Sequence, residues 1–598
     1  MNIPKDPHSY AHPEKAKILN IDLDLQVDFE NKQLKGTACI EFETIGDSNQ
    51  LILDTKSLEI KTVADTQGHA LSWKLKKPDK HLGSALIIDL SPNIKKINIQ
   101  YVTSPQAEAL QWLDTQQTEG KEYPFLFTQS QAILARSWIP LQDSPGIRFT
   151  FTARIQVPVG MMALMSAVNP QKHTIDGIYH FDMEQPIPGY LMSLAVGNIE
   201  FAPVGPRTGV YAEPQMLDKA QYEFADMEKM LETAENLYGP YRWGRYDLIV
   251  LPPSFPFGGM ENPRITFATP TVIAGDRSLT SLVAHELAHS WSGNLVTNAT
   301  WNDFWLNEGF TVYFEHRIME ALYGRSYSEM LAALSRQDLI NEVAEFIKDG
   351  KGDETRLKLN LTGRDPDDGV TTIAYDKGYF FLRSLEDYVG REIFDKFLQD
   401  YFDSYAFRSN DTESFLKYLN QNLFVNNNLV PEPHVEQWIY KEGLPENMPV
   451  VQSDRFDRVH DELNRFLKGI NASDLKDTNS WTTHEWLHFL KGLPEQLSPG
   501  QMKDLDNTFG FTTSGNSEIL GAWFVPVINN KYESGYNALE HFLIHTGRRK
   551  FLTPLYSAMI KTEDGEKMAE EIYKKARPNY HFVSSNSIDD LLNWNPDQ

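Results

Sequence analysis

His285-Glu286-Leu287-Ala288-His289, followed by Asn307-Glu308-Gly309, is the stretch on which the interpretation of this chain rests. No proline or glycine interrupts residues 281–291, so a helix is the expected local structure, with Gly293-Asn294 as its first expected stop. Residues four apart share one face of a helix, so both imidazoles can bind one zinc ion. Glu286 lies beside that face, where it can act on a metal-bound water as a general base.

A second helix is predicted after the first, and it carries the third acidic ligand. Apolar residues recur at helical spacing in Phe310, Phe314, Ile318 and Leu322. Asn302 or Asp303 is the candidate N-cap and Gly324 the expected stop. Glu308 then falls in the first turns, and 18 residues (290–307) separate it from His289. Two histidines and one glutamate form the three-ligand type of zinc site that leaves a position open for catalysis.

Upstream of the metal motif, a glycine pair precedes another carboxylate. Residues 246–251 read as a strand, and Pro252-Pro253 leads to Gly258-Gly259-Met260-Glu261-Asn262. Two glycines lack the side chains that would keep a peptide backbone at a distance. Glu261 can then select substrates that carry a free, cationic N-terminus.

These motifs resemble the M1 family of zinc aminopeptidases. Residues 251–263, LPPSFPFGGMENP, and residues 547–551, GRRKF, are most similar to its leukotriene A(4) hydrolase branch, and the resemblance extends over the whole chain.

The family implies an α+β multidomain fold. We expect an N-terminal antiparallel β saddle (1–200), a thermolysin-like zinc catalytic domain (201–445) and a C-terminal α-helical domain (446–598). The strand pattern agrees, since Ile21, Leu23, Leu25, Val27 and Phe29 alternate with polar residues. Helices are predicted over 218–238 and after Tyr375, and residues 445–450 interrupt the helical pattern.

The resemblance implies a zinc aminopeptidase that removes the N-terminal residue from short peptides. One Zn²⁺ per chain is expected on His285, His289 and Glu308, with Glu286 as the general base and Tyr375 as the donor to the oxyanion.

Further roles follow from the resemblance. Glu261, together with Gly258, Gly259 and Met260, is expected to hold the substrate, and Gln131, with Gln129 behind it on one strand face, to contact its amine. The remaining expected site residues are Asp367 in the substrate pocket, Arg548 and Lys550 at the carboxylate end of short peptides, and Glu315 as the partner of a zinc histidine.

Three alternatives stay open. A bifunctional epoxide hydrolase of the leukotriene type is one, although Val370 and Phe257 stand where that branch has tyrosines. A zinc endopeptidase would use the same metal motif, but Glu261 argues against it. A catalytically dead peptide-binding protein would not need Glu286 and Tyr375 beside all three ligands.

Composition limits the partners of the chain. Its 598 residues carry 56 basic and 82 acidic side chains, and a net charge of −26 argues against nucleic acid or an anionic membrane as the main partner. Cys39 is the only cysteine, so no intrachain disulfide can form. The N-terminal residues 1–7 and the rest of the chain lack a long apolar run. We expect a cytoplasmic protein, with a monomer favoured.

Overall fold

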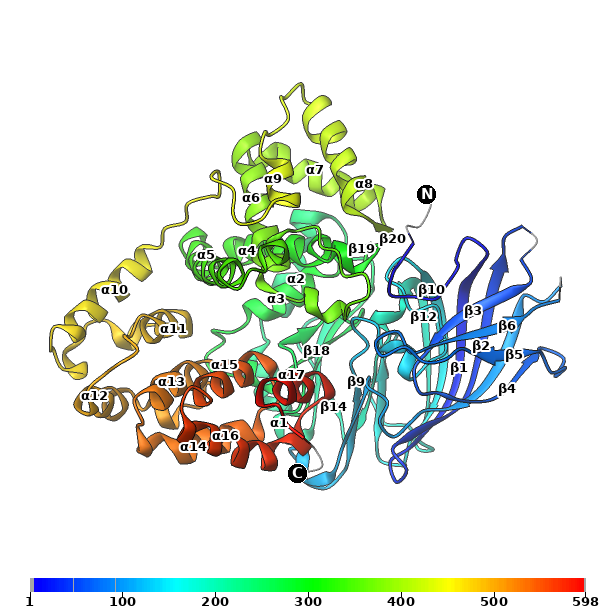
Figure 1. Cartoon of the computed structure of the whole chain (residues 1–598), viewed down its shortest axis with the longest axis horizontal. Helices are drawn as coiled ribbons and strands as arrows, with labels where there is room; N and C mark the ends of the chain where they lie inside the picture. Colours follow the sequence, from blue (N-terminus) through cyan, green and yellow to red (C-terminus); the bar gives the residue numbers. More distant parts are fainter. Residues whose placement is uncertain (1–4, 47, 92, 596–598) are drawn as a thin grey trace.

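A β-rich N-terminal part, a central α/β part and a C-terminal helical part make up the computed structural model (Figure 1), as the sequence predicted. The structure describes residues 5–46, 48–91 and 93–595. The first four residues of the N-terminal stretch considered above lie outside this range. The boundaries near residues 200 and 445 remain predictions.

Alternating side chains build the N-terminal strands. In β1, Ile21, Leu23 and Leu25 are buried while the aspartates between them are exposed, which buries one face of the sheet. The strands are β1 (Ala16–Asp28), β2 (Gln33–Thr44), β3 (Gln50–Thr55), β4 (Glu59–Asp65), β5 (Trp73–Leu75), β6 (Ser84–Asp89), β7 (Lys96–Val102), β8 (Leu110–Leu113), β9 (Phe125–Thr128), β10 (Arg148–Gln156), β11 (Met162–Met165), β12 (Ile178–Pro188) and β13 (Leu194–Gly197).

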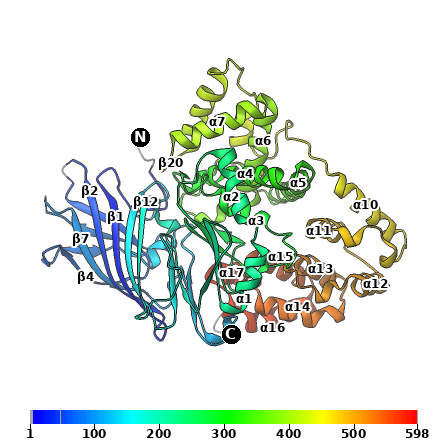
Figure 2. The same cartoon turned by 180° about the vertical axis from the view of Figure 1, so that it is seen from behind.

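These strands form three sheets, of which the largest runs in the order β12-β10-β1-β2-β7-β4 (Figure 2). The others run β11-β13-β9-β8 and β3-β6-β5. The expected saddle is not wholly antiparallel, because β1 pairs with β10 in parallel, with Asn20 opposite Thr150. A parallel pair needs a long connection, and here most of the N-terminal part lies between the two strands.

The central part surrounds a mixed sheet in the order β14-β15-β16-β18-β17. Its short strand β17 is an edge, paired only with β18 among the described strands. The elements are β14 (Glu200–Pro203), β15 (Thr208–Ala212), α1 (Pro214–Glu223), α2 (Met227–Tyr238), β16 (Tyr246–Val250), β17 (Gly259–Met260), β18 (Ile265–Ala268), α3 (Ser281–Ala288), β19 (Val296–Asn298), α4 (Trp305–Tyr323), α5 (Arg325–Lys348), α6 (Gly378–Val389), α7 (Arg391–Ser404), β20 (Arg408–Asn410), α8 (Thr412–Leu419) and α9 (Val435–Tyr440).

Several predicted helix limits were wrong. The helix expected over 218–238 is divided into α1 and α2. Glu223, the last residue of α1, accepts hydrogen bonds from the N–H groups of Gly275 and Arg277. Helix α3 ends at Ala288 rather than near Gly293, and α4 begins after Phe304. Asp303 does not cap α4 because its carboxylate accepts hydrogen bonds from Thr412 and Lys358.

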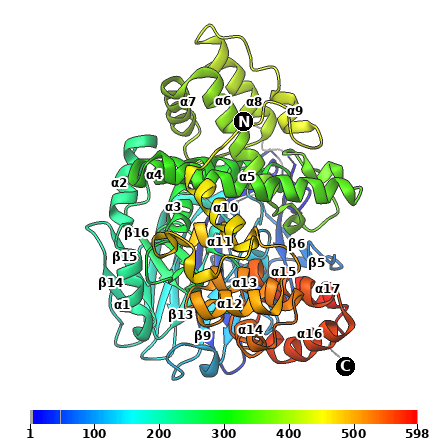
Figure 3. The same cartoon turned by 90° about the vertical axis from the view of Figure 1, so that its left-hand side faces the viewer.

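The C-terminal helices enclose a separate core, which includes Leu463, Trp523 and Tyr573. They lie side by side below α5 in Figure 3, and α10 and α11 contact α5. Among the helices that the structure describes, none combines the length and the apolar character needed to cross a membrane. The helices are α10 (Asp454–Leu467), α11 (Thr483–Lys491), α12 (Pro499–Phe509), α13 (Ser517–Asn529), α14 (Tyr536–His545), α15 (Arg549–Met559), α16 (Glu563–Ala576) and α17 (Phe582–Leu592).

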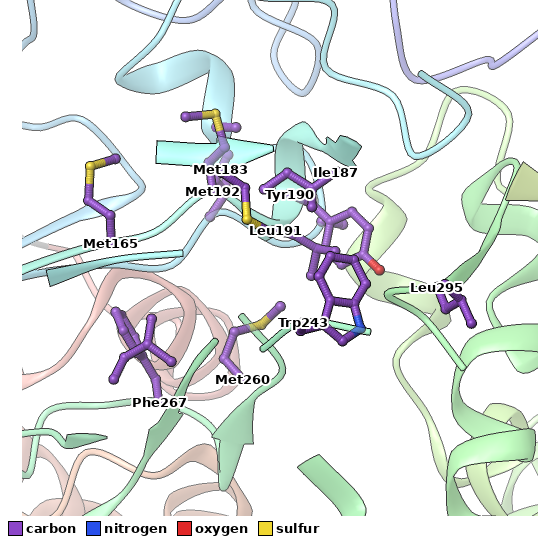
Figure 4. Packing of buried hydrophobic residues seen from close by; sticks show 14 of the residues in the cluster. Met165, Met183, Ile187, Tyr190, Leu191, Met192, Trp243, Met260, Phe267 and Leu295 are labelled. Atoms are coloured by element: carbon purple, nitrogen blue, oxygen red, sulfur yellow. The ribbon is translucent and has the colours of Figure 1, made fainter. Parts of the chain in front are cut away.

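The N-terminal and central parts share one apolar core. Figure 4 shows Ile187 and Tyr190 from the N-terminal part close to Trp243 and Met260 from the central part. All four side chains are almost fully buried. The interface is therefore packed like a domain interior, which holds the two parts in a fixed relation.

Helices α4 and α6 touch backbone to backbone at two glycines. A Cβ on Gly309 would lie 2.7 Å from the Cα of Gly378. The short π-helix Ile373–Lys377 leads into α6, so this contact also sets how closely Tyr375 approaches α4. The glycine of Asn307-Glu308-Gly309 is needed for this close approach.

Substitution Gly309→Ala is expected to destabilise the protein. The added methyl meets backbone that cannot rotate away, at a cost of about 1–3 kcal/mol, which outweighs the roughly 1 kcal/mol that alanine gains in a helix. Urea unfolding would measure the loss. Gly515→Ala is the matched control, because a Cβ there has nothing within 4 Å. Equal midpoints for the two variants would contradict this account of the crossing.

Candidate metal and peptide site

Helices α3 and α4 bring the predicted metal ligands together. Nε2 of His285 lies 3.3 Å from Oε2 of Glu308, and Nε2 of His289 lies 3.5 Å from the same oxygen. The three candidate ligand atoms lie within 4.8 Å of one another. His285 lies on α3, His289 is the cap residue that follows its last turn, and Glu308 lies in the first turn of α4. They therefore converge on one point in space.

Hydrogen bonds behind the two rings orient them. His289 donates from Nδ1 to the Ser292 carbonyl at 3.0 Å, since a carbonyl can only accept. Nδ1 of His285 lies 3.0 Å from a carboxylate oxygen of Glu315, the partner that the sequence predicted. Protons on both Nδ1 atoms leave the Nε2 lone pairs directed at Glu308, as metal ligation requires.

The electrostatics of the cluster fit a cation. Oε2 of Glu308 is buried and has no hydrogen-bond partner. Burial raises the pKa of Glu286 well above its ordinary value, and the carboxylates of Glu261 and Glu308 raise it further. Buried carboxylates this close together are stable in the charged form only with a compensating cation, and two imidazoles with a carboxylate are a donor set that suits zinc.

Glu286 faces the glycine segment. Its side chain is buried, and a Cβ on Gly259 would lie only 2.1 Å from its Oε1. Gly258 is also confined, because a Cβ there would lie 2.7 Å from a guanidinium nitrogen of Arg548. The side chains of Glu286 and Arg548 therefore occupy the space that a Cβ at these two positions would need. This constraint is separate from any role of the glycines in admitting a peptide.

Glu261 follows the edge strand and is 4% exposed. Its Oε1 has no hydrogen-bond partner, while its backbone carbonyl accepts a bond of 2.7 Å from the side chain of Asn294. Burial raises the pKa of Glu261 to about 7. The Asn307 side chain acts in the opposite direction through a hydrogen bond to this carboxylate. Burying the remaining oxygen without a partner is costly, and a cationic ligand would remove that cost.

The predicted glutamines lie just beyond a strand and not on it. Strand β9 ends at Thr128, so the shared strand face expected for Gln129 and Gln131 was wrong. The chain turns there, and Gln129 donates to the sulfur of Met260 at 3.2 Å. Nε2 of Gln131 is buried and has no partner.

Tyr375 lies against the first histidine. Its ring stacks on that of His285, with centroids 6.1 Å apart and planes at 15°. Burial raises the pKa of Tyr375 well above 10, and the carboxylates of Glu308 and Glu261 add to this. The hydroxyl therefore keeps its proton and can act as a hydrogen-bond donor.

Arg548 and Lys550 converge on a buried acid that sequence reasoning did not find. Glu518 accepts a bond of 3.1 Å from Nη1 of Arg548 and bonds of 2.8 Å from Lys550. Burial opposes ionisation, but the two cations hold the pKa of Glu518 at about 2. Arg548 is buried and Lys550 is exposed, so only the lysine reaches solvent freely.

Asp367 lies at the N-terminal end of a 3₁₀ turn, Pro366–Gly369, on the segment before Tyr375. Burial raises the pKa of Asp367 to about 7, and Asp365 adds to the effect. The backbone N–H of Ala132, next to Gln131, acts in the opposite direction, which places this carboxyl near the glutamine segment.

Other supporting residues were also missed. Thr311 contacts Nδ1 of His289 at 3.1 Å, and Asn307 donates from its side chain to Tyr190 at 3.3 Å. Asn307 precedes the candidate ligand Glu308, so its place in the motif was a usable signal. No sequence signal pointed to Ser292, Thr311 or Tyr190, because their roles arise from tertiary contacts.

Comparisons with known proteins identify the family. The peptidase M1 N-terminal domain matches residues 7–191, the peptidase family M1 domain 222–438 and the leukotriene A4 hydrolase C-terminal domain 481–592. The chain is 38% identical to leukotriene A-4 hydrolase of Xenopus laevis, over 97% of this chain and 98% of that protein. It is 37% identical to leucine aminopeptidase 2 of Yarrowia lipolytica, over 98% and 93%.

Solved structures agree with the family models. Yeast LTA4 hydrolase in complex with bestatin matches with a TM-score of 0.92 at 33% identity, over 99% of this chain and 98% of that one. Fold and site thus define a metallopeptidase, a hydrolase acting on peptide bonds. The chain belongs to the M1 family of zinc aminopeptidases, in the leukotriene A4 hydrolase branch, as its motifs predicted.

Replacing Glu315 is expected to weaken metal binding. Glu315→Leu removes the acceptor that orients His285, and loss of such a group typically costs about 10-fold to 100-fold in metal affinity. Glu315→Gln keeps a neutral acceptor and is expected to lose less. Competition with a zinc chelator would measure both affinities. If Glu315→Leu held zinc as tightly as the parent protein, the bond to His285 would have no role in binding.

Proposed function

We propose that this protein is a zinc-dependent aminopeptidase that removes the N-terminal residue from short peptides, with one zinc ion held by His285, His289 and Glu308. One observation carries the proposal: the buried, unpartnered Oε1 of Glu261 lies at the end of an edge strand beside the candidate metal ligands. Such a carboxylate can mark where a peptide begins.

The edge strand provides a binding mode for the peptide. Strand β17 pairs with β18 on one side only, so its other backbone groups can pair with an extended chain. Main-chain pairing of this kind is independent of sequence, which suits an enzyme that acts on varied peptides. We assign Gly258, Gly259 and Met260 to this contact.

The amine end of the peptide is assigned to Glu261 and Gln131. An ammonium donates hydrogen bonds and carries charge, so it satisfies Oε1 of Glu261 and stabilises the ionised carboxylate. The carbonyl oxygen of the Gln131 side chain can accept a further bond from the amine. With the amine fixed there, the first peptide bond lies over the metal ligands.

The chemistry follows from the groups around that bond. Zinc, when bound, acts as a Lewis acid that polarises the carbonyl and activates water. Glu286 takes a proton from the attacking water and delivers it to the leaving amine. Tyr375 donates a hydrogen bond to the oxygen on which negative charge develops. Thr311, Ser292 and Glu315 keep the two imidazoles in place.

The far end of the peptide is assigned to Lys550 and Arg548, with Asp367 lining the pocket for the first side chain. Glu518 already neutralises one of the two cations, so a single net positive charge is available to a C-terminal carboxylate. The cytoplasmic location and the monomeric state expected from the sequence remain predictions.

The epoxide hydrolase alternative gains no support from the site. Val370 and Phe257, which stand where the leukotriene branch has tyrosines, carry no hydroxyl groups and pack against the apolar core. The hydrogen-bond donors that these positions would supply are therefore missing.

Glu286→Gln is expected to remove catalysis while leaving the metal in place. The amide keeps the shape of the side chain but cannot accept a proton, which should lower kcat by at least about 100-fold to 10,000-fold. Zinc content and the melting temperature should match the parent protein, because Glu286 is not assigned as a ligand. Near-normal turnover by this variant would show that the base lies elsewhere.

Metal removal is expected to abolish activity reversibly. Elemental analysis should find one zinc per chain, since the three assigned ligands form a single open site. Dialysis against a strong chelator should eliminate peptide hydrolysis, and added zinc should restore it. Full activity in metal-free protein would refute the zinc assignment.

Glu261→Gln tests the aminopeptidase character directly. The substitution removes a charge-assisted bond to the amine, so kcat/KM for free peptides should fall at least about tenfold. Acetylating the peptide should nearly abolish cleavage by the parent enzyme and should affect the variant proportionately less. If the parent cleaved free and acetylated peptides equally well, the protein would be an endopeptidase.

A further inference from the structure

Arg148, at the start of β10 in the N-terminal part, reaches across the interface into the central part. Its guanidinium donates to the Pro186 carbonyl at 3.0 Å, to Oγ1 of Thr297 at 2.6 Å and to the Asn294 carbonyl. The first partner belongs to the N-terminal part. The other two belong to the segment that follows His289 in the central part, so Arg148 joins the two.

The charge of Arg148 is unusual for such a position. The side chain is 8% exposed, and burial lowers the pKa of Arg148 to about 10. No carboxylate of the described residues forms an ion pair with it; only Tyr190 acts against the effect of burial. Burying a charge without a counter-ion is costly, and a neutral core residue would pack here more cheaply. The guanidinium of Arg148 donates to three acceptors in different directions, which a neutral core residue could not do.

The segment that Arg148 holds contacts the amine anchor. Asn294, whose carbonyl accepts from Arg148, donates from its own side chain to the Glu261 carbonyl at 2.7 Å. Its backbone N–H also bonds to the His289 carbonyl at 3.0 Å. The backbone N–H and the backbone carbonyl of Asn294 are therefore both bonded, while its side chain holds Glu261, whose Oε1 has no partner.

A second contact from the N-terminal part supports the same segment. The Tyr190 hydroxyl donates to the Gly293 carbonyl at 3.2 Å and accepts from the Asn307 side chain at 3.3 Å. Figure 4 shows the hydroxyl of Tyr190 on the side of Leu295, a residue of this segment. This contact acts on the metal side of the segment, whereas Arg148 acts at Asn294, next to Glu261.

We propose that Arg148 is a positioning residue for the amine anchor: it holds the 292–297 segment so that Asn294 fixes the backbone of Glu261. This inference rests on the proposed function, because it assumes that Glu261 binds the substrate amine. Loosening the segment would let the carboxylate move from the place where the ammonium must lie. The expected defect is a loss of discrimination for the amine, with the metal still bound.

Two hydroxamates isolate that property. Leucine hydroxamate and its des-amino counterpart, 4-methylpentanohydroxamic acid, share a metal-binding group and a side chain and differ only in the α-amine. The ratio of their inhibition constants therefore reports the contribution of the amine anchor. In Arg148→Met and in Asn294→Ala the preference for the amine should fall about tenfold, as is common when an orienting partner is lost. Inhibition by the des-amino compound and zinc content should stay near parent values.

The double variant tests whether the two residues act through one another. If Arg148 acts by holding Asn294, the combined variant should lose no more amine preference than the worse single variant, because linked residues are not additive. Independent roles would multiply the two losses, and this result would overturn the proposed path. Arg154→Met is the control, since Arg154 lies on the same strand but is exposed and bonds to Asp24.

Failure of this inference can be told apart from failure of the proposed function. If both hydroxamates inhibited the parent protein equally well, the amine anchor itself would be refuted, and the role of Arg148 with it. A parent that prefers the amine, with an unchanged preference in Arg148→Met, would refute only the role of Arg148. Should Arg148→Met not fold, Arg148→Lys decides. The single nitrogen of a lysine cannot take the three separate places from which Nε, Nη1 and Nη2 of Arg148 reach Pro186, Thr297 and Asn294. Full amine preference in Arg148→Lys would overturn the proposal.

Discussion

Mutual repulsion among buried carboxylates is the constraint on which the rest of the structure depends. Glu261, Glu286 and Glu308 are almost fully buried. The first two lie in one cluster with His289, and Glu308 lies in a second cluster that shares the same histidine. Such a cluster is stabilised by cations, and the proposed function supplies two. One is the zinc assigned to the imidazoles and Glu308, and the other is the substrate ammonium assigned to Glu261. In this proposal, the negative charge that makes the cluster costly also selects its ligands.

The fold positions these groups by close contacts at glycines, where the backbone can approach a neighbouring side chain or helix. Gly259 lets the edge strand lie directly against Glu286, and Gly309 with Gly378 lets α4 and α6 touch, which brings Tyr375 over His285. Neither approach would be possible with a side chain at the glycine. The reactive groups are therefore positioned mainly by rigid elements, and their supporting hydrogen bonds come from residues such as Ser292 and Glu315.

Local spacing explains which parts could be predicted. The i, i+4 histidines and the helix that carries Glu308 follow from helical geometry, and the three-part fold follows from patterning together with the family resemblance. Helix limits were missed where side chains have distant partners: Glu223, at the end of α1, bonds to the loop at Gly275, and the predicted helix is divided just after it. The pairing of Glu518 with Arg548, and the contact of Arg148 with Asn294, join residues that lie 30 and 146 positions apart. The spacing of apolar residues in the sequence does not predict such contacts, so they are seen only in the folded structure.

The apolar interface between the N-terminal and central parts also has a consequence for how this architecture can change over generations. Gln129, Gln131 and Arg148 come from the N-terminal part, whereas Glu261 and the histidines come from the central part, and the two meet in one continuous core. Recombination that exchanged either part for that of a distant relative would mismatch both the core and the polar contacts across it. The two parts are therefore expected to be inherited as one unit. The C-terminal helices have their own core, but Arg548 and Gly547 contact the segment before β17, so a replacement there would have to keep those contacts.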